Sequence, residues 1–396
     1  MQLVIVGVGY VGLVTGLSLA KTGHKINFID TDKEKINNLN QGIPPFFEPE
    51  VENYLLNSKI KQNIEFFDSY NKVKWEDIDV VIICVQTPTN EYGEVDIRFI
   101  SSVFDNIENL IVNDSVICIK STIHPIALEK VFKDFSINYD DLVFNPEFLR
   151  EGSAFDDFFH TDRVIVGSLN HDNMKIIGEL YSSINTEIIY TDPVSSQLIK
   201  YLSNSYLPLR LSFVNEASRI IDVLNANQED VLKGVGLDSR IGLDYFRPSP
   251  GWGGSCFPKD VQEIQKLAKN QNLNLPLLQS ILNSNDIHIS WFSDKLVGML
   301  EANNLQKVYL IGASFKENTD DVRYSPTLVI YKKLQEYGIN VEIYDKFVSM
   351  DFVLNDINLL NDDSLIVEMF PLGDSYNELQ DKIKELKHTV YYRFWD

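Results

Sequence analysis

The first thirty residues combine a glycine-rich turn with the flanking elements that such a turn requires. Leu3–Val6 is a short β-branched run, Gly7-Val8-Gly9-Tyr10-Val11-Gly12 follows it, a helical pattern continues to about Thr22, and Lys25–Asp30 has the composition of a strand. The order strand, G-x-G-x-x-G, helix, strand is typical of the βαβ unit that binds a dinucleotide at the N-terminus of its helix. This unit restricts the chain to an α/β fold with a parallel sheet.

The same unit indicates which dinucleotide is bound. Gly7 permits the tight turn, Gly9 lets the pyrophosphate approach the backbone, and Gly12 allows the helix to lie close to the strand. Asp30, 23 positions after Gly7, would accept hydrogen bonds from a ribose 2′-hydroxyl and would repel a 2′-phosphate. We therefore expect NAD rather than NADP as the cofactor.

Further along the chain, strand-like runs alternate with helical patterns. The runs that would extend the first sheet are 79–85, 115–119, 142–145 and 163–167. Lys307–Ile311 and Asn340–Asp345 enclose a second βαβ unit, with a helix from Ser325-Pro326 to Tyr337-Gly338, and this unit lacks the G-x-G-x-x-G. Val390–Arg393 has the composition of one more strand.

Between the two units the pattern is helical. Asp192 is a good N-cap and Pro193 a good first residue for a helix of about thirty residues, and 259–270 and 276–303 also predict helices. The expected fold is therefore α/β, with two Rossmann-like doubly wound domains joined by a long central helix. The expected division is a dinucleotide-binding domain at 1–190, a helical dimerisation region at 191–290 and a C-terminal Rossmann-like domain at 291–396.

The charge of the chain limits its partners. Thirty-five Lys and Arg stand against 57 Asp and Glu, which gives a formal net charge of −22. Such a surface repels nucleic acid and anionic membranes, so an anionic ligand needs a locally basic pocket. No run approaches the ~18 apolar residues of a membrane helix, and the apolar start Met1–Ala20 lacks the basic flank of a signal peptide. We expect a cytoplasmic protein without a nucleic-acid or membrane partner.

Two of the three cysteines have unremarkable settings. Cys84 and Cys118 fall in apolar runs that predict buried parallel strands. The three cysteines form no cluster of metal-ligand spacing, so neither a disulfide nor a metal site is expected.

The third cysteine lies in a loop suited to nucleophilic chemistry. Cys256 follows Gly251-Trp252-Gly253-Gly254-Ser255 and precedes Phe257-Pro258-Lys259-Asp260. With Pro258 at the first helical position, the thiol would lie beside the positive end of a helix dipole and near Lys259, and both lower the pKa of a thiol. Cys256 is therefore the candidate nucleophile.

Three further clusters carry groups suited to acid–base chemistry. Thr87-Pro88 and Lys120-Ser121-Thr122 follow two expected strands, which places hydroxyls at the carboxyl edge of the sheet, where ligands bind. Asn145–Gly152 is an acidic turn. Lys200 and Asn204, spaced i, i+4, project from one face of the long helix.

Together these motifs resemble the UDP-glucose/GDP-mannose dehydrogenase family of nucleotide-sugar dehydrogenases. The resemblance covers nearly the whole chain, through Gly7–Leu13, Pro146–Gly152, Lys200–Asn204, Arg240–Gly242, Gly253–Asp260 and Phe315–Arg323. It implies a four-electron oxidation of a sugar C6 alcohol to a carboxylate, with two NAD per sugar and a thiohemiacetal and thioester on Cys256. Within the family, the chain most resembles the bacterial members that convert UDP-glucose to UDP-glucuronate.

The resemblance also implies how six residues would share the chemistry. Lys200 and Asp260 would act through an ordered water as the base for the C6 hydroxyl, and Asn204 with Lys200 would stabilise developing oxyanions. Cys256 would attack the aldehyde. Glu147 would activate the water that hydrolyses the thioester, with Thr122 helping to hold that water.

The ligand contacts that the resemblance implies gather at loops and helix ends. For NAD they are Gly7, Gly9, Tyr10, Val11, Gly12, Asp30, Lys35, Thr87, Thr122, Glu151, Lys259 and Arg323. For the UDP-sugar they are Glu147, Phe148, Leu149, Lys200, Asn204, Arg240, Tyr245, Phe246, Arg247, Ser249, Trp252, Gly253, Phe315 and Lys316. Arg240 would reach the sugar nucleotide from the neighbouring subunit of a homodimer.

Three positions depart from the family pattern. Pro208 lies inside the expected long helix, where it removes the hydrogen bond to the carbonyl of residue 204 and predicts a kink. Trp252 replaces the usual Phe or Tyr and would narrow the sugar pocket. Arg393 lies in the region least similar to the family, and the resemblance gives only weak support for a contact between Arg393 and the nucleotide.

Other activities stay open at this point. The same chemistry could act on GDP-mannose, UDP-N-acetylmannosamine or UDP-N-acetylglucosamine, although Pro258-Lys259-Asp260 argues against the N-acetyl sugars. A two-electron hydroxyacid dehydrogenase shares the first domain but would have no use for Cys256 or for a second Rossmann-like domain. A non-enzymatic NAD-binding protein would not need the six candidate catalytic residues together.

Overall fold

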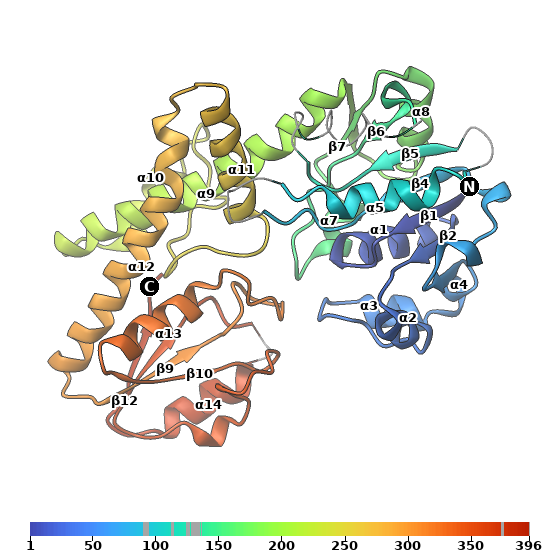
Figure 1. Cartoon of the computed structure of the whole chain (residues 1–396). Coiled ribbons are helices and arrows are strands. Elements are labelled where there is room, and N and C mark those ends of the chain that lie inside the picture. The colour runs from blue at the N-terminus through green and yellow to red at the C-terminus, as the bar shows by residue number, and fades with distance from the viewer. Residues whose placement is uncertain are drawn as a thin grey trace. The chain divides into compact units, whose positions relative to one another are not determined.

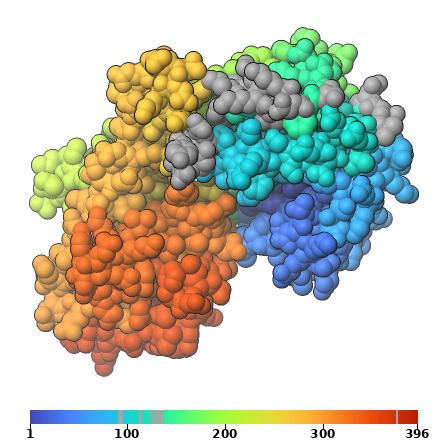
Figure 2. Space-filling model, in the orientation of Figure 1, coloured from blue at the N-terminus to red at the C-terminus, as the bar shows by residue number. Residues whose placement is uncertain are grey.

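The computed structural model describes residues 1–89, 95–111, 115–123, 127, 135, 137–373 and 376–395. The chain divides into two compact units, Met1–Leu202 and Ser203–Asp396, and each is an α/β structure (Figure 1). Figure 2 gives the same face as a space-filling model, in which the first unit runs from blue to green and the second from yellow-green to red.

The first unit is built on an eight-stranded sheet with the order β3-β2-β1-β4-β5-β6-β7-β8. Its strands are β1 Gln2–Val6, β2 Lys25–Ile29, β3 Ile64–Phe67, β4 Val80–Ile83, β5 Val116–Ile119, β6 Val143–Phe144, β7 Arg163–Gly167 and β8 Glu187–Thr191. Strand order reverses at β1, which is flanked by β2 and β4, so a crevice at the carboxyl edge is expected there.

Helices cover both faces of this sheet because successive strand residues point to opposite sides. In β1, Leu3 and Ile5 belong to one buried cluster and Val4 and Val6 to another. The helices described here are α1 Tyr10–Lys21, α2 Lys33–Asn40, α3 Val51–Leu56, α4 Ser58–Lys61, α5 Arg98–Ile107, α7 Ala154–Phe159 and α8 His171–Glu179. Residues of α1 and α8 lie in the first cluster and residues of α5 in the second.

A single long helix, α9 (Pro193–Val223), carries the chain from the first unit into the second. Its first turn is capped by Asp192, whose carboxylate accepts from the Ser195 backbone N–H at 2.9 Å. The predicted helix of about thirty residues is confirmed, and it continues through Pro208 without ending there. The kink expected at Pro208 stays a prediction.

The second unit contains three more helices of the central region and a five-stranded parallel sheet. The elements are α10 Gln228–Gly236, α11 Phe257–Asn270, α12 Pro276–Ala302, β9 Lys307–Ile311, α13 Pro326–Glu336, β10 Asn340–Tyr344, β11 Val353–Leu354, β12 Ser364–Glu368, α14 Asn377–Glu385 and β13 Val390–Arg393. The strand order β11-β10-β9-β12-β13 places β9 at the centre, with α12 and α13 on one face and α14 on the other.

The predicted α/β fold with two Rossmann-like domains and a long helix is confirmed, with four differences in detail. The first sheet is not wholly parallel, because Phe144 of β6 pairs with Gly167 of β7 in the antiparallel sense. Strands β3, β8, β11 and β12 were not predicted. The strand expected at 79–85 ends at Ile83, so Cys84 lies just beyond it. Helix α11 begins at Phe257, which puts Pro258 at the second helical position rather than the first.

No helix within the described ranges is both long enough and apolar enough to cross a membrane.

Candidate active site

The glycine-rich loop between β1 and α1 has the geometry of a pyrophosphate cradle. Gly7 adopts φ +93°, and a Cβ on Gly12 would lie 2.0 Å from the Gly7 carbonyl oxygen, so neither position accepts a larger residue without movement. A Cβ on Gly9 would meet no described heavy atom within 4 Å, and Gly9 is the N-cap of the 12-residue α1. An open backbone at the positive end of a helix fits a dinucleotide pyrophosphate.

Asp30 closes this loop from the end of β2. Its Oδ2 accepts from the Val8 backbone N–H at 2.9 Å and from Lys35 Nζ at 2.8 Å, and its Oδ1 accepts from the Asp32 N–H at 3.0 Å. The structure thus brings together two residues predicted to bind the cofactor. The carboxylate faces the loop, where a 2′-hydroxyl would be accepted and a 2′-phosphate repelled.

Tyr10 lies in the same region, against acidic side chains. Burial raises the pKa of the Tyr10 phenol, and Glu48, Glu151 and Glu147 raise it further. Glu48, which no sequence motif singled out, is buried and accepts from the backbone N–H groups of Gly152 at 2.5 Å and Ala154 at 2.9 Å. Glu48 therefore fixes the turn that contains Glu151.

A hydrogen bond between two threonines joins the segments that follow β4 and β5. The Thr87 hydroxyl donates to the Thr122 carbonyl at 2.7 Å. This bond joins two predicted cofactor residues from neighbouring strands, at the edge where the parallel-sheet rule places ligands.

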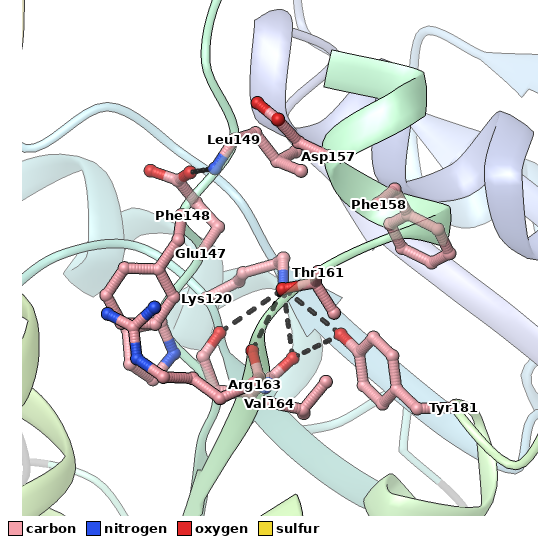
Figure 3. A pocket seen from close by; sticks show the side chains of 12 residues that line it. Lys120, Glu147, Phe148, Leu149, Asp157, Phe158, Thr161, Arg163, Val164 and Tyr181 are labelled. Atoms are coloured by element: carbon pink, nitrogen blue, oxygen red, sulfur yellow. Dashed lines mark hydrogen bonds between the residues drawn. The ribbon is translucent and has the colours of Figure 1, made fainter. Parts of the chain in front are cut away.

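Glu147 and Lys200 form a buried pair in the first unit. Lys200 Nζ donates to the Glu147 carbonyl oxygen at 2.6 Å and to its Oε1 at 2.9 Å, while Oε2 accepts from the Leu149 backbone N–H at 2.6 Å. Two cations lie near the Phe148 ring: its centroid is 4.0 Å from the Arg163 guanidinium carbon and 5.2 Å from Lys200 Nζ. Figure 3 shows Glu147, Phe148 and Leu149 of this turn, with the bond from the Leu149 N–H to the Glu147 carboxylate and the Arg163 side chain beside the Phe148 ring.

In the second unit, Cys256 is the N-cap residue of α11. Its thiol is exposed, and its carbonyl accepts the first helical bond from Asp260 N–H at 2.9 Å. The positive end of a 14-residue helix therefore lies beside the sulfur, which favours the thiolate. The Ser255 hydroxyl lies 3.7 Å from Sγ.

Asp260 is the centre of a buried polar cluster one turn into α11. Its Oδ2 accepts from Asn204 Nδ2 at 2.6 Å and its Oδ1 lies 2.7 Å from Lys259 Nζ, which also pairs with Glu263 at 3.3 Å. Burial lowers the pKa of Lys259, but the carboxylates of Asp260 and Glu263 outweigh it and raise the pKa overall. Lys259 is thus charged and directed at these carboxylates. Its predicted contact with NAD stays a prediction.

The cysteine loop itself packs on the segment after β9. Gly254 has φ +88° and donates its N–H to the Arg323 carbonyl at 3.0 Å, and a Cβ there would lie 2.8 Å from the Phe315 ring. A Cβ on Gly253 would lie 1.9 Å from the Tyr324 carbonyl oxygen. The two glycines allow a contact that brings predicted substrate residues from distant parts of the sequence side by side.

Residues before the cysteine loop are held by the central helices. The Trp252 indole is buried and donates to the Ser212 hydroxyl at 2.9 Å. The Asn285 side chain accepts from the Trp252 backbone N–H and donates to the Trp252 carbonyl. Ser249 is held by Asn215 and by His288, whose Nε2 lies 2.8 Å from the Ser249 carbonyl oxygen. The sequence offered no local signal for these four supporting residues, Ser212, Asn215, Asn285 and His288.

Other predicted substrate residues have separate partners. Arg247 lies over the Trp395 ring at 5.0 Å, Lys316 over the Phe315 ring at 5.7 Å, and the ring of Tyr245 is 6.4 Å from that of Phe257. Phe246 is buried in a cluster with Val214, Ile221 and Leu232, so a sugar contact would have to use its backbone.

Two predicted arginines lie at the surface of this unit. Arg240 is 87% exposed at its side chain and pairs with Asp238 at 2.6 Å, and Arg323 pairs with Asp321 at 2.7 Å. Arg393 lies over the Tyr391 ring at 5.6 Å. Among the residues that the structure describes, no group of three or more His, Cys, Asp or Glu could hold a metal ion.

Comparisons with protein families match almost the whole chain. The UDP-glucose/GDP-mannose dehydrogenase family matches through its NAD-binding domain at residues 1–185, its central domain at 194–287 and its UDP-binding domain at 309–387. Similar curated proteins include UDP-glucose 6-dehydrogenase of Rickettsia felis, 36% identical over 87% of this chain and 78% of the relative, and YwqF of Bacillus subtilis, with the same enzyme name, 35% identical over 87% and 79%.

Solved structures give the same picture of the fold. A UDP-glucose dehydrogenase from Pyrobaculum islandicum matches with a TM-score of 0.84 and 25% identity, over 100% of this chain and 94% of that one. A UDP-D-ManNAc dehydrogenase from Pyrococcus horikoshii matches with a TM-score of 0.86 and 21% identity, over 99% and 95%, which bears on the fold alone.

Proposed function

Since the chain belongs to the UDP-glucose/GDP-mannose dehydrogenase family, we propose that it is an NAD-dependent enzyme that oxidises UDP-glucose to UDP-glucuronate with two NAD per sugar. The relatives at 34–36% identity over 87% of the chain carry the name UDP-glucose 6-dehydrogenase, which supports this sugar over GDP-mannose and the N-acetylhexosamines. The matched ranges also support the proposed division into parts at 1–190, 191–290 and 291–396.

One observation carries the proposal most directly. Cys256 is an exposed thiol at the positive end of α11, and the buried Asp260 one turn on is held by Asn204 and Lys259. A two-electron alcohol dehydrogenase needs a base but no nucleophile. A thiol beside a buried acid–base cluster suits an enzyme that holds an aldehyde covalently between two oxidations.

In the first oxidation a base must remove the proton of the C6 hydroxyl. We assign this step to Asp260 and Lys200 acting through a water, with Asn204 and Lys200 donating to the oxygen as it becomes negative. NAD, when bound, accepts the hydride that leaves C6 in each oxidation. The product of the first stage is the C6 aldehyde.

In the second stage the Cys256 thiolate attacks the aldehyde carbon. The C–S bond forms, the carbonyl oxygen becomes the thiohemiacetal oxygen, and loss of the second hydride leaves a thioester. Glu147 takes a proton from a water that attacks the thioester, with Thr122 holding that water, and the C–S bond breaks to release the carboxylate and the thiol. The sum is UDP-glucose, two NAD⁺ and water giving UDP-glucuronate, two NADH and three protons.

The binding roles follow the residues predicted from the resemblance. The loop Gly7–Gly12 with Asp30, Lys35, Tyr10 and Thr87 is proposed to hold NAD, and the basic side chains of Arg247 and Lys316 are proposed to neutralise the UDP diphosphate. Local cations of this kind are needed because the chain as a whole carries a charge of −22. A cytoplasmic location is proposed because a reducing compartment keeps Cys256 a thiol.

A homodimer is also proposed, with Arg240 acting on the partner's substrate. Support comes from α9, where Tyr206, Phe213 and Ile220 recur every seven residues and are 57%, 59% and 62% exposed. Side chains seven apart lie on one face of a helix, and large apolar groups there gain free energy when a second surface covers them.

The test is the amount of NADH formed per sugar. Limiting UDP-glucose, GDP-mannose, UDP-N-acetylmannosamine and UDP-N-acetylglucosamine are each incubated with excess NAD, and the NADH is measured at completion. Two NADH per UDP-glucose are expected, with little turnover of the other sugars. A single NADH per sugar, or two NADH retained by Cys256→Ala, would contradict the thioester mechanism.

A further inference from the structure

Lys120 is a buried lysine to which the proposed mechanism gives no role. It is the first residue after β5 and is 5% exposed. Its ammonium group lies 2.9 Å from Asn145 Oδ1, 3.4 Å from the Asn145 carbonyl oxygen and 3.2 Å from the Tyr181 hydroxyl (Figure 3). Lys120 thus has three acceptors for three protons, and two of them belong to one residue.

The register of the sheet brings Lys120 and Asn145 together. Ile119 of β5 pairs with Phe144 of β6, so the residue that follows each strand emerges at the same place. Asn145 is held further by its own N–H to the Ile119 carbonyl at 2.9 Å and by its Nδ2 to the Ile165 carbonyl at 2.7 Å. Asn145 is therefore fixed to three parts of the sheet edge.

The charge at this position needs an explanation. Within the described residues, no hydrogen-bond partner of Lys120 is a carboxylate. Burial raises the pKa of the Tyr181 phenol and raises that of the Cys118 thiol to about 12, so both neighbours are neutral at neutral pH. A buried cation without an anion costs desolvation free energy that an apolar side chain of similar length would avoid.

Asn145, which Lys120 holds, is only two residues before Glu147. Pro146, with its fixed φ, separates Asn145 from Glu147, so the position of one restricts the position of the other. Lys120, Asn145, Pro146 and Glu147 line the same cavity of about 30 Å³, which has room for about one water and leaves the turn little space to move.

We propose that Lys120 is a positioning residue for Glu147: it anchors Asn145 and so fixes the turn whose Glu147 carbonyl and carboxylate hold Lys200. This role rests on the proposed function, in which Glu147 activates the water that hydrolyses the thioester. Loss of the anchor lets the carboxylate move from that water, and a displacement of about 1 Å can cost a catalytic step up to about 10²-fold.

The experiment compares hydrolysis of the thioester with the oxidations that precede it. Lys120→Met removes the ammonium group at nearly constant length, and Asn145→Ser removes its main acceptor from the other side. Ser168→Ala is the matched control, because Ser168 is also a buried polar residue directly after a strand of this sheet but donates to the Leu142 carbonyl rather than to Asn145. The full-length protein is mixed with UDP-glucose and NAD, and the rapid NADH phase, the steady rate and the acylated fraction of Cys256 by intact mass are measured.

In Lys120→Met and Asn145→Ser we expect a rapid NADH phase close to that of the unaltered protein, a steady rate roughly tenfold lower or more, and a higher acylated fraction. The double variant should be no slower than the slower single variant, because both changes break one link. Ser168→Ala should behave as the unaltered protein.

An unchanged ratio between the rapid and steady phases, or an equal fall in both, would overturn the role, since a merely structural lysine lowers the active fraction without raising acylation. If Lys120→Met does not fold, the same measurements on Asn145→Ser provide the test. If the unaltered protein forms no NADH from UDP-glucose, the proposed function fails first, and the role of Lys120 fails with it.

Discussion

The ammonium group of Lys200 donates to both the main-chain carbonyl and the carboxylate of Glu147, at 2.6 and 2.9 Å. Two residues 53 positions apart thus form one buried pair. The second carboxylate oxygen of Glu147 accepts from the Leu149 backbone N–H. Lys200, a proposed oxyanion donor, therefore sets the orientation of Glu147, a proposed base. A substitution at either residue is expected to change the position of the other.

Glu147→Gln should separate oxidation from hydrolysis. The amide oxygen can still accept from Lys200, but an amide cannot take a proton from water, so thioester hydrolysis should slow by roughly 10²-fold while the oxidations persist. Stopped-flow measurement should give a burst of two NADH per site followed by a slow phase. Glu179→Gln, at the exposed end of α8, is the control and should show no burst; an equal loss of both phases in Glu147→Gln would contradict the assignment.

The two glycines of the cofactor loop should respond differently to alanine. Gly12→Ala puts a Cβ 2.0 Å from the Gly7 carbonyl, so α1 must shift, and both the melting temperature and NAD affinity should fall. Gly9→Ala meets no described atom within 4 Å, so the protein should stay folded while NAD binding weakens about tenfold or more, because the methyl group blocks the pyrophosphate.

Thermal unfolding and titration with NAD check both variants. Gly234→Ala, in α10 with open space at its Cβ, is the control and should leave NAD affinity unchanged. Normal NAD affinity in Gly9→Ala would show that the cofactor does not approach this backbone.

His288 should make the second unit sensitive to acid. Burial lowers its pKa to about 4, with Arg219 acting in the same direction, although its bond to Ser249 and Glu216 oppose the shift. Below pH 6.5 the unfolded chain protonates this histidine and the native protein does not, so stability is fully present above 6.5 and falls by up to about 3 kcal/mol as pH drops to about 4.

Urea unfolding followed by tryptophan fluorescence at several pH values measures this loss, because the rings of His288 and Trp291 stack at 5.5 Å. His288→Gln should flatten the dependence between pH 4 and 6.5, while His171→Gln, at the start of α8, should keep it. Equal slopes in all three proteins would refute the linkage.

Arg240 should act across the proposed dimer. Arg240→Ala and Cys256→Ala should each be nearly inactive alone, but a dimer with one chain of each kind contains one site with both residues intact. Coexpression with two different affinity tags isolates this mixed dimer, whose activity should return to about half of the unaltered value per dimer. No recovery in the mixed dimer would mean that Arg240 serves its own chain.

The parts of the fold that the sequence predicted are those in which local pattern and final burial agree. β1, α1 and β2 combine apolar periodicity with glycine at fixed offsets, and α9 has a capping Asp192 before Pro193. β8 was missed because Glu187–Thr191 is mostly exposed or half-buried and lacks the apolar run of an inner strand.

In the candidate site, residue identity was predicted but the contacts were not. Asn204 and Asp260 were each selected by motif, and nothing in their spacing of 56 residues indicates that they bond. The Lys120–Asn145 contact depends on strand register, and the bond from Glu48 to Gly152 spans 104 residues. Such contacts arise only when segments far apart in the sequence have packed together.

The close approach of Gly253 and Gly254 to Tyr324 and Phe315 has a consequence for protein engineering. Exchanging the C-terminal Rossmann-like part for that of a relative, in order to change the nucleotide recognised, would cut through the surface that shapes the cysteine loop. A chimera joined after Tyr324 would retain the native residues that contact this loop. In a chimera joined at Lys307, Gly253 and Gly254 would instead pack against the relative's backbone and side chains. The boundary for modular exchange therefore differs from the boundary of the fold.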